Sequence, residues 1–187
     1  MSLLKERESS RSPLIGPAEQ SAHAGMPAPA AHTEVELDAL IGLLTFPKAR
    51  IETVTLGHSR DTASRAAAEA LAAAWTERGG TVLSTVSWPE TAASWLRPAH
   101  RLTAEIPDAW VMAAAPLGFA QLARRLRHST DWGPARTYAF ASLQDSRVPA
   151  LAGDDVLDGL RGVTADGGTW DVHHRWVTTR QPAEETS

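Results

Sequence analysis

Cysteine is absent from this sequence of 187 residues. Without a thiol the chain cannot form a disulfide, a zinc-thiolate centre or an iron–sulfur cluster, and it has no cysteine nucleophile. No apolar run approaches the ~20 residues that span a bilayer. The first residues, MSLLKERESSR, carry charges of both signs and lack the apolar core of a secretory signal. We therefore expect no membrane span and a cytoplasmic location.

Lysine is also scarce, since it occurs only as Lys5 and Lys48, and the formal net charge is −4. Arginine supplies the remaining positive charge, but no stretch gathers it into a basic face that would bind phosphate backbones. Neither G-x-G-x-x-G nor G-x-x-x-x-G-K-[ST] occurs, which argues against dinucleotide and P-loop sites. The sequence predicts no nucleic-acid partner and no cofactor.

The composition changes near residue 33. Residues 1–32 are rich in Ser, Pro, Ala and Glu without a sustained period, which predicts a disordered arm. Residues 33–180 alternate between β-rich runs and helical patterns, which predicts a single α/β domain, and residues 181–187 form a polar tail.

The most informative stretch is Arg50–Arg65, which reads RIETVTLGHSRDTASR. The β-branched run Ile51–Leu56 is followed by a short polar turn and then by an alanine-rich helical pattern over Asp61–Arg78. Strand, turn and helix in this order form the unit from which parallel α/β sheets are built.

The same alternation continues along the chain. Further strands are predicted over Thr81–Trp88, Ala109–Ala115 and Arg136–Ser142, and further helices over Glu34–Leu44, Thr91–Glu105 (with a kink at Pro98) and Pro116–His128. Short helical pieces are predicted over Val148–Ala152 and Asp154–Leu160, and extended chain over Arg161–Ala165 and Thr169–Thr178. This succession indicates a doubly wound, mostly parallel, flavodoxin-like sheet of about five strands in the order 2-1-3-4-5, with helices on both faces.

Ligands of such sheets bind beyond the carboxyl ends of the strands. Residues His58, Ser59, Arg60 and Asp61 follow the first predicted strand directly. They could be turn residues in which Ser59 or Asp61 caps the next helix, or ligand contacts, or a catalytic group that pairs Ser59 with His58 and Asp61. Adjacent side chains rarely reach the alignment of a catalytic triad, and no G-x-S-x-G elbow is present, so we expect no enzyme.

Two other patterns could indicate a functional site. His173 and His174 are adjacent, but neighbours on a strand point to opposite faces, so we predict no metal site. Trp170 and Trp176 lie in the same extended segment and are candidates for an interface with another chain.

Five stretches together resemble the second lobe of the type 1 periplasmic-binding fold, the family of the leucine/isoleucine/valine-binding proteins of ABC importers. They read VTLGHSRDTASRAAAEAL, ERGGTVLSTVSW, IPDAWVMAAAPLGFAQLARRLR, YAFASLQDSRVPALAGDD and DGLRGVT. The resemblance covers roughly Leu37–Thr164. The family's first lobe, its secretion signal and its lipid-anchor cysteine have no counterpart in the sequence.

This resemblance implies a ligand clamped between two similar lobes. The positions that it places on the ligand wall are His58, Ser59, Asp61, Ala115, Pro116 and Ser142. The family usually has a Tyr-Gly pair near the start of the helix, where this sequence reads Asp61-Thr62-Ala63, so that aromatic contact is missing.

We therefore expect a non-enzymatic domain that binds or senses a small polar ligand of the amino-acid or amide type. The alternative is an interaction scaffold or accessory subunit. It would pair with a second copy or with a partner protein through the face that the missing lobe leaves open.

Overall fold

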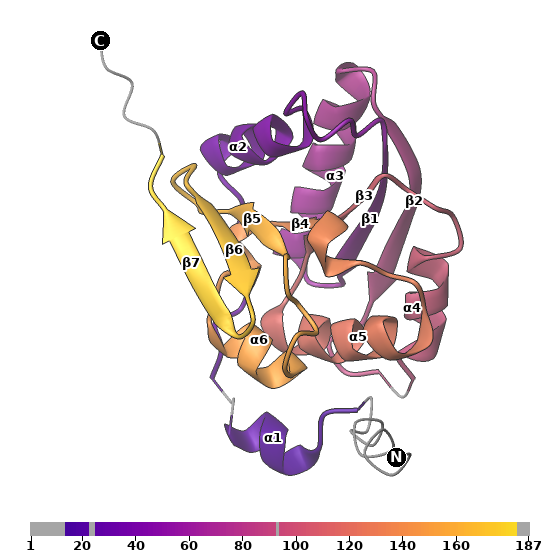
Figure 1. Ribbon diagram of the computed structural model, residues 1–187, viewed down its shortest axis with the longest axis vertical. Helices are drawn as coiled ribbons and strands as arrows, with labels where there is room; N and C mark the ends of the chain where they lie inside the picture. The colour runs from indigo at the N-terminus through magenta and orange to yellow at the C-terminus, as the bar shows by residue number, and fades with distance from the viewer. Residues whose placement is uncertain (1–13, 23–24, 93, 183–187) are drawn as a thin grey trace, which may run out of the picture.

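One sheet of seven strands runs through the computed structural model, which describes residues 14–22, 25–92 and 94–182 (Figure 1). The strand order is β2-β1-β3-β4-β5-β6-β7. The first five strands in this order are parallel, and β6 and β7 pair antiparallel at the end. The predicted doubly wound fold and the order 2-1-3-4-5 are confirmed, whereas the sheet has seven strands and not about five.

The strands are β1 (Thr53–Ser59), β2 (Thr81–Trp88), β3 (Ala109–Ala113), β4 (Thr137–Ala139), β5 (Arg161–Val163), β6 (Thr169–His173) and β7 (Trp176–Arg180). The helices are α1 (Pro17–Ala22), α2 (Glu34–Leu44), α3 (Thr62–Glu77), α4 (Leu96–Leu102), α5 (Pro116–Ser129) and α6 (Arg147–Ala152), and short 3-10 turns cover Pro134–Arg136 and Ala141–Leu143.

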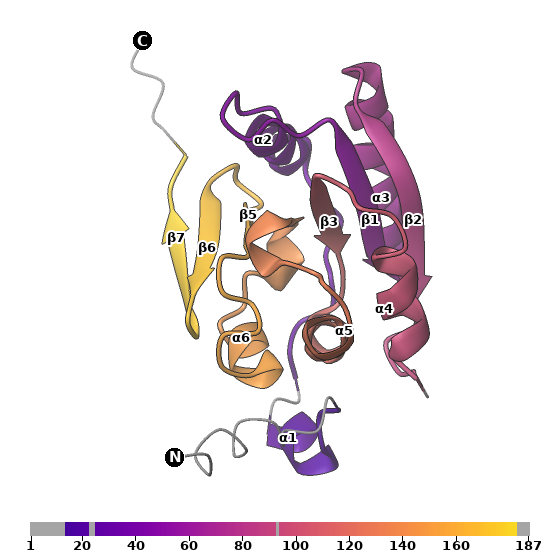
Figure 2. The same cartoon turned by 45° about the vertical axis from the view of Figure 1, so that its right-hand side comes forward.

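Helices cover both faces of the sheet (Figure 2). On one face α2 and α3 bury a cluster that includes Leu40 and Leu71, and on the other face α4, α5 and α6 bury a larger cluster that includes Phe119 and Leu151. All five residues of β3 are buried, because helices cover both sides of this central strand. None of the helices in the described residues is long and apolar enough to cross a membrane.

Four local expectations were wrong. The predicted strand Arg136–Ser142 is shortened to β4, because 3-10 turns cover Pro134–Arg136 and Ala141–Leu143 on either side of it. The predicted extended segment Thr169–Thr178 is a hairpin, since His174 adopts a left-handed φ of 56° in the turn between β6 and β7. The predicted helix Thr91–Glu105 shrinks to α4, where Pro98 occupies the first turn and so interrupts no hydrogen bond. The stretch Asp154–Leu160 forms turns and no helix, because Asp155 and Gly159 have φ values of 60° and 86°.

Part of the segment expected to be a disordered arm is described by the structure. Within residues 1–32 it contains α1 and the extended segment Gly25–His32, while residues 1–13 lie outside the described residues. Ile15 is 4% exposed and joins the larger core cluster, and its N–H donates to Gln121 Oε1 at 3.0 Å. Ile15 therefore attaches to the core a stretch whose composition suggested disorder. The boundary of the domain at residue 33 stays a prediction.

Candidate functional site

Two pockets lie at the carboxyl edge of the parallel strands, on either side of the segment Gly25–His32. Pro27, Ala28 and Pro29 line both of them. We call them the Asp61 pocket, of about 390 Å³, and the Ser142 pocket, of about 370 Å³. This is the edge at which an open α/β sheet binds its ligands, because the loops that follow the strands meet there.

The Asp61 pocket is built where β1, β2 and β3 end. Residues at the ends of the three strands or just after them line it together with the N-terminal segment: Gly25, Met26, Pro27, Ala28, Pro29, Ser59, Arg60, Asp61, Glu90, Ala115, Pro116 and Leu117. Most of these side chains are apolar, and the polar groups are concentrated at Ser59, Arg60, Asp61 and Glu90. The pocket therefore combines an apolar wall with a few polar groups, as small-molecule sites do.

Ser59 is the centre of a hydrogen-bond network at this edge. Its hydroxyl donates to Asp61 Oδ2 at 2.5 Å, lies 3.1 Å from Ser64 Oγ, and accepts from the N–H of Ala115 at 2.8 Å. Asp61 Oδ1 accepts from the N–H of Ser64 at 2.8 Å, as expected of the residue that caps α3. The end of β1, the start of α3 and the end of β3 are thereby fixed relative to one another.

The two acidic side chains of the pocket have opposite pKa shifts. Burial opposes ionisation of Asp61, but hydrogen bonds from Ser59 and Ser64 outweigh burial and lower its pKa. Burial raises the pKa of Glu90, which the N–H of Gly118 lowers in part and the negative charge of Asp61 raises further. Asp61 is therefore a fixed negative charge at neutral pH, and Glu90 ionises less readily than an ordinary glutamate.

Glu90 belongs to the site but was not among the predicted residues. It follows β2 by two positions, and its Oε1 accepts from the N–H of Gly118 in the first turn of α5 at 2.7 Å. A Cβ on Gly118 would lie 2.7 Å from Glu90 Oε2, so the glycine leaves room for the carboxylate. The rule that singled out the residues after the first strand applies equally to Glu90 after the second.

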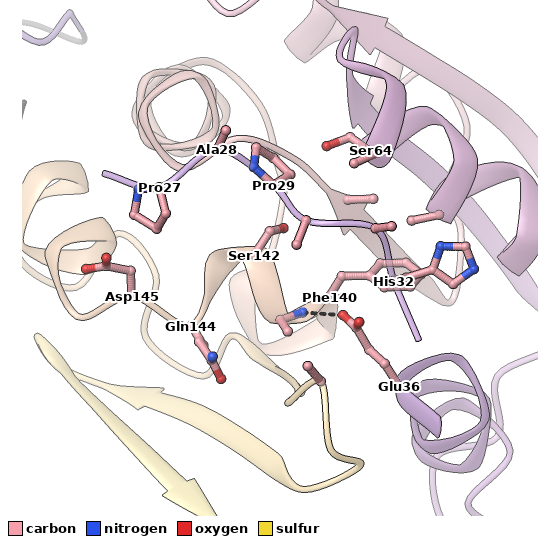
Figure 3. A pocket seen from close by; sticks show the side chains of 17 residues that line it. Pro27, Ala28, Pro29, His32, Glu36, Ser64, Phe140, Ser142, Gln144 and Asp145 are labelled. Carbon is pink, nitrogen blue, oxygen red and sulfur yellow. Dashed lines mark hydrogen bonds between the residues drawn. The ribbon is translucent and has the colours of Figure 1, made fainter. Parts of the chain in front are cut away.

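The Ser142 pocket lies between the 3-10 turn after β4 and the helices α2 and α3 (Figure 3). Glu36 holds this turn in place, since its Oε1 accepts from the N–H of Ala141 at 2.7 Å while its Oε2 accepts from the N–H of Thr33 at 3.3 Å. The ring of His32 meets the ring of Phe140 edge-on, with 6.1 Å between the centroids. Glu36 and His32 were also missed, because they precede the first strand in the sequence.

The six predicted wall residues are divided between these places. Ser59, Asp61, Ala115 and Pro116 line the Asp61 pocket, and Ser142 lines the other one. His58 lines neither. Strand β1 extends to Ser59, beyond the expected end at Leu56, so His58 is a buried strand residue.

The contacts of His58 bear on the catalytic alternative. Its Nδ1 lies 2.8 Å from the carbonyl oxygen of Ser59 and donates to it, since a carbonyl can only accept. The Ser59 hydroxyl is held instead by Asp61, Ser64 and Ala115. This nitrogen of His58 therefore does not act as a base toward the Ser59 hydroxyl in the structure.

The adjacent histidines of the hairpin line neither of these two pockets. His173 and His174 are exposed, and their Nδ1 atoms lie 3.9 Å from Asp158 Oδ1 and 3.3 Å from Asp155 Oδ1, respectively. Within the described part of the chain, no three His, Asp or Glu side chains are grouped so that they could hold a metal ion.

The comparisons with known proteins found proteins of similar structure but none of similar sequence. No family model matches the sequence, and no curated protein matches it. A putative branched-chain amino acid ABC transporter from Rhodospirillum rubrum has a TM-score of 0.58 and 19% identity over 70% of this chain and 37% of its own. An extracellular ligand-binding receptor from Rhodopseudomonas palustris HaA2 has a TM-score of 0.59 and 20% identity over 68% of this chain and 34% of its own.

A substrate-binding periplasmic protein from Ralstonia solanacearum has a TM-score of 0.57 and 18% identity over 80% of this chain and 42% of its own. The chain thus spans between about a third and two fifths of the length of these solved proteins. Identities this low show the fold and nothing further. The expected resemblance is confirmed: this chain has the fold of part of the ABC-transporter ligand-binding proteins, of a size that suits one lobe.

Proposed function

We propose that this protein binds a small polar molecule of the amino-acid or amide type at the carboxyl edge of its sheet, in the Asp61 pocket. The observation that carries the proposal is the fixed carboxylate of Asp61, held by Ser59 and Ser64 at the wall of a mostly apolar pocket. A carboxylate accepts hydrogen bonds from an ammonium or an amide N–H, and the apolar wall suits an aliphatic side chain.

The likeness to ligand-binding proteins supports this choice over catalysis. The structurally similar proteins are described as a branched-chain amino acid transporter, a ligand-binding receptor and a substrate-binding protein. We infer a non-enzymatic binding or sensing role for this chain. Because this chain spans only part of those proteins, we infer the class of ligand from the chemistry of the pocket and not from the names of the similar proteins.

The segment Gly25–His32 contributes to the proposed site. In a two-lobed protein the opposite lobe covers the carboxyl edge, and here Pro27, Ala28 and Pro29 lie across that edge and line both pockets. A ligand in the Asp61 pocket would be enclosed on one side by this segment, which excludes water that would otherwise compete for Asp61.

A thermal-shift screen read by tryptophan fluorescence tests the proposal. Amino acids, short amides, urea and short carboxylic acids would be compared on the wild type, on Asp61→Asn and on Asp38→Asn, a control at an exposed position of α2. A ligand at ~100 times its dissociation constant raises the stability by roughly 2.7 kcal/mol, which is a shift of several degrees. We expect the shift in the wild type and the control and its loss in Asp61→Asn. An equal shift in all three proteins would refute the site.

A further inference from the structure

Strand β7 forms one end of the sheet, and no strand of the described residues pairs with its outer side. Both views show that side open toward solvent (Figures 1 and 2). Natural edge strands block pairing with prolines, bulges or charges in their interior. The sequence of β7, WVTTR, has neither proline nor glycine, its only charge is at the end, and its register with β6 has no bulge.

The register of the hairpin decides which backbone groups are free. His173 pairs with Trp176 across a two-residue turn, and such a closing pair exchanges both of its hydrogen bonds. Hydrogen-bonded pairs then recur at every second position, so Thr178 and Arg180 also direct their backbone groups toward β6. The N–H and C=O groups of Val177 and Thr179 therefore point outward, to the free edge.

The side chains of β7 alternate in the same way. Val177 packs against the larger core cluster, whereas Trp176, Thr178 and Arg180 are on the opposite face. Trp176 is 76% exposed, so most of this large aromatic side chain is open to solvent. Arg180 Nη1 donates to Asp171 Oδ2 at 3.0 Å, which holds the guanidinium near this face.

We propose that β7 is a self-association edge, on which β7 of a second copy pairs antiparallel with Thr178 on the two-fold axis. In this register Val177 of one copy lies opposite Thr179 of the other, so all the outward backbone groups are used. Trp176 of each copy then faces Arg180 of the other in a non-hydrogen-bonded pair, where side chains come closest. Each end of the interface gains a cation–π contact.

Neighbouring registers lack this complementarity. Moving the two-fold axis to Val177 places Trp176 opposite Thr178, and moving it to Thr179 places Trp176 opposite Pro182. Only the register centred on Thr178 matches an aromatic ring with a guanidinium at both ends. The two sheets then become one continuous sheet, and neither ligand pocket is involved because β7 lines neither of them. The proposal is therefore independent of the proposed function.

The absence of cysteine gives this register a direct test. Thr178→Cys places two thiols opposite each other across the axis in a non-hydrogen-bonded pair, at a Cα separation of ~4.5 Å that a disulfide accepts. Thr85→Cys is the matched control, since Thr85 is an exposed threonine of β2 at the other end of the sheet. Under mild oxidation we expect the Thr178→Cys protein to form a covalent dimer much faster than the Thr85→Cys protein. Equal rates in the two variants would overturn the register.

Sedimentation velocity over a concentration series tests the association itself. We expect the wild type to dimerise reversibly, and Trp176→Ala to weaken the dimer by roughly tenfold through the loss of two cation–π contacts. Thr179→Pro removes an outward N–H without touching the pairing with β6, and it should abolish the dimer while the circular dichroism stays unchanged. A wild type that stays monomeric at several hundred micromolar, or a dimer that both variants leave intact, would refute the proposal.

Discussion

Ser59 joins three parts of the chain through one hydroxyl. It is 1% exposed and contacts Asp61 from the loop before α3, Ser64 from α3 and the N–H of Ala115 after β3. A buried donor that loses its acceptor costs more than an average hydrogen bond contributes, because no water replaces the partner. The residue is therefore important for stability as well as for the proposed site.

Ser59→Ala should lower the free energy of unfolding by roughly 1–3 kcal/mol, because it leaves the N–H of Ala115 without its acceptor. Ser142→Ala is the matched control, since among the described residues its half-buried hydroxyl has no hydrogen-bond partner that would be lost. Urea denaturation of the two variants and the wild type measures the difference. Equal stability of all three proteins would contradict the structural role of Ser59.

Asp61 should make the fold sensitive to acid. Its pKa in the folded protein is lower than the ordinary value of 3.8, so the unfolded chain takes up the proton first as the pH falls. The stabilisation is complete above the ordinary pKa and is lost as the pH falls through the folded pKa. The difference in unfolding free energy between the wild type and Asp61→Asn should therefore shrink on acidification. Denaturation curves of the two proteins at several pH values measure this difference.

Glu90 should have the opposite effect. Its pKa is raised above 4.5, mainly by burial, so the folded state holds the proton to a higher pH than the unfolded chain. Stability that Glu90 contributes at low pH is lost as the pH rises from 4.5 toward the folded pKa. Glu90→Gln should remove this loss, and its stability relative to the wild type should grow across that interval. A constant difference would mean that the carboxyl is not buried as the structure has it.

At the scale of single elements, α2 has the most complete N-terminal cap. Thr33 Oγ1 accepts from the N–H of Glu36 at 3.0 Å, and the Glu36 side chain returns to the N–H of Thr33, which together form a capping box. Thr33 Oγ1 also donates to the carbonyl of Ala165 at 2.7 Å, which connects α2 to the loop after β5.

Thr33→Ala should cost roughly 1–2 kcal/mol of stability, because it removes the cap and the contact with Ala165 together. Thr76→Ala serves as the control, since Thr76 is exposed near the end of α3 and its hydroxyl bonds only to the carbonyl of Ala72. That change should be close to neutral, as alanine is the better helix former. Thermal unfolding followed by circular dichroism at 222 nm compares the two variants, and equal losses would rule out the cap as the cause.

Prediction from the sequence was most accurate for elements that combine a regular spacing of apolar residues with residues that mark their ends. Helix α3 is an example, because Asp61 caps it and Gly79-Gly80 follows it, and the structure has both ends within a residue of the prediction. The hairpin of β6 and β7 was missed because its turn is His174-Arg175, which lacks the glycine or asparagine that usually marks such a turn.

The residues of the candidate site divide in the same way, into those that a local sequence pattern predicts and those that it does not. Residues that directly follow the first strand could be found by the rule that ligands lie at carboxyl ends, and Ser59 and Asp61 do line a pocket. Glu36 and the segment Gly25–His32 reach the site through tertiary packing, which no local pattern encodes. Ile15 shows the limit most clearly, since its buried side chain and its hydrogen bond with Gln121 attach to the domain a stretch whose composition predicted disorder.

At the scale of the whole molecule, the carboxyl edge of the sheet holds both the Asp61 pocket and the Ser142 pocket. The structurally similar proteins are longer than this chain, and in this chain Pro27, Ala28 and Pro29 line both pockets of the edge. The proposed function therefore depends on one claim, that a small polar molecule binds at this edge.

Backbone amide chemical shifts, recorded by NMR during titration with mixtures of amino acids and short amides, test that claim most directly. We expect saturable shifts at Ser59, Asp61 and Ala115, which Asp61→Asn abolishes while Asp38→Asn preserves them. The pocket of about 490 Å³ beside Ile106 and Trp110, at the opposite end of the strands, serves as an internal control. Shifts confined to that pocket, or no shifts at millimolar concentrations of every mixture, would rule out the proposed ligand site.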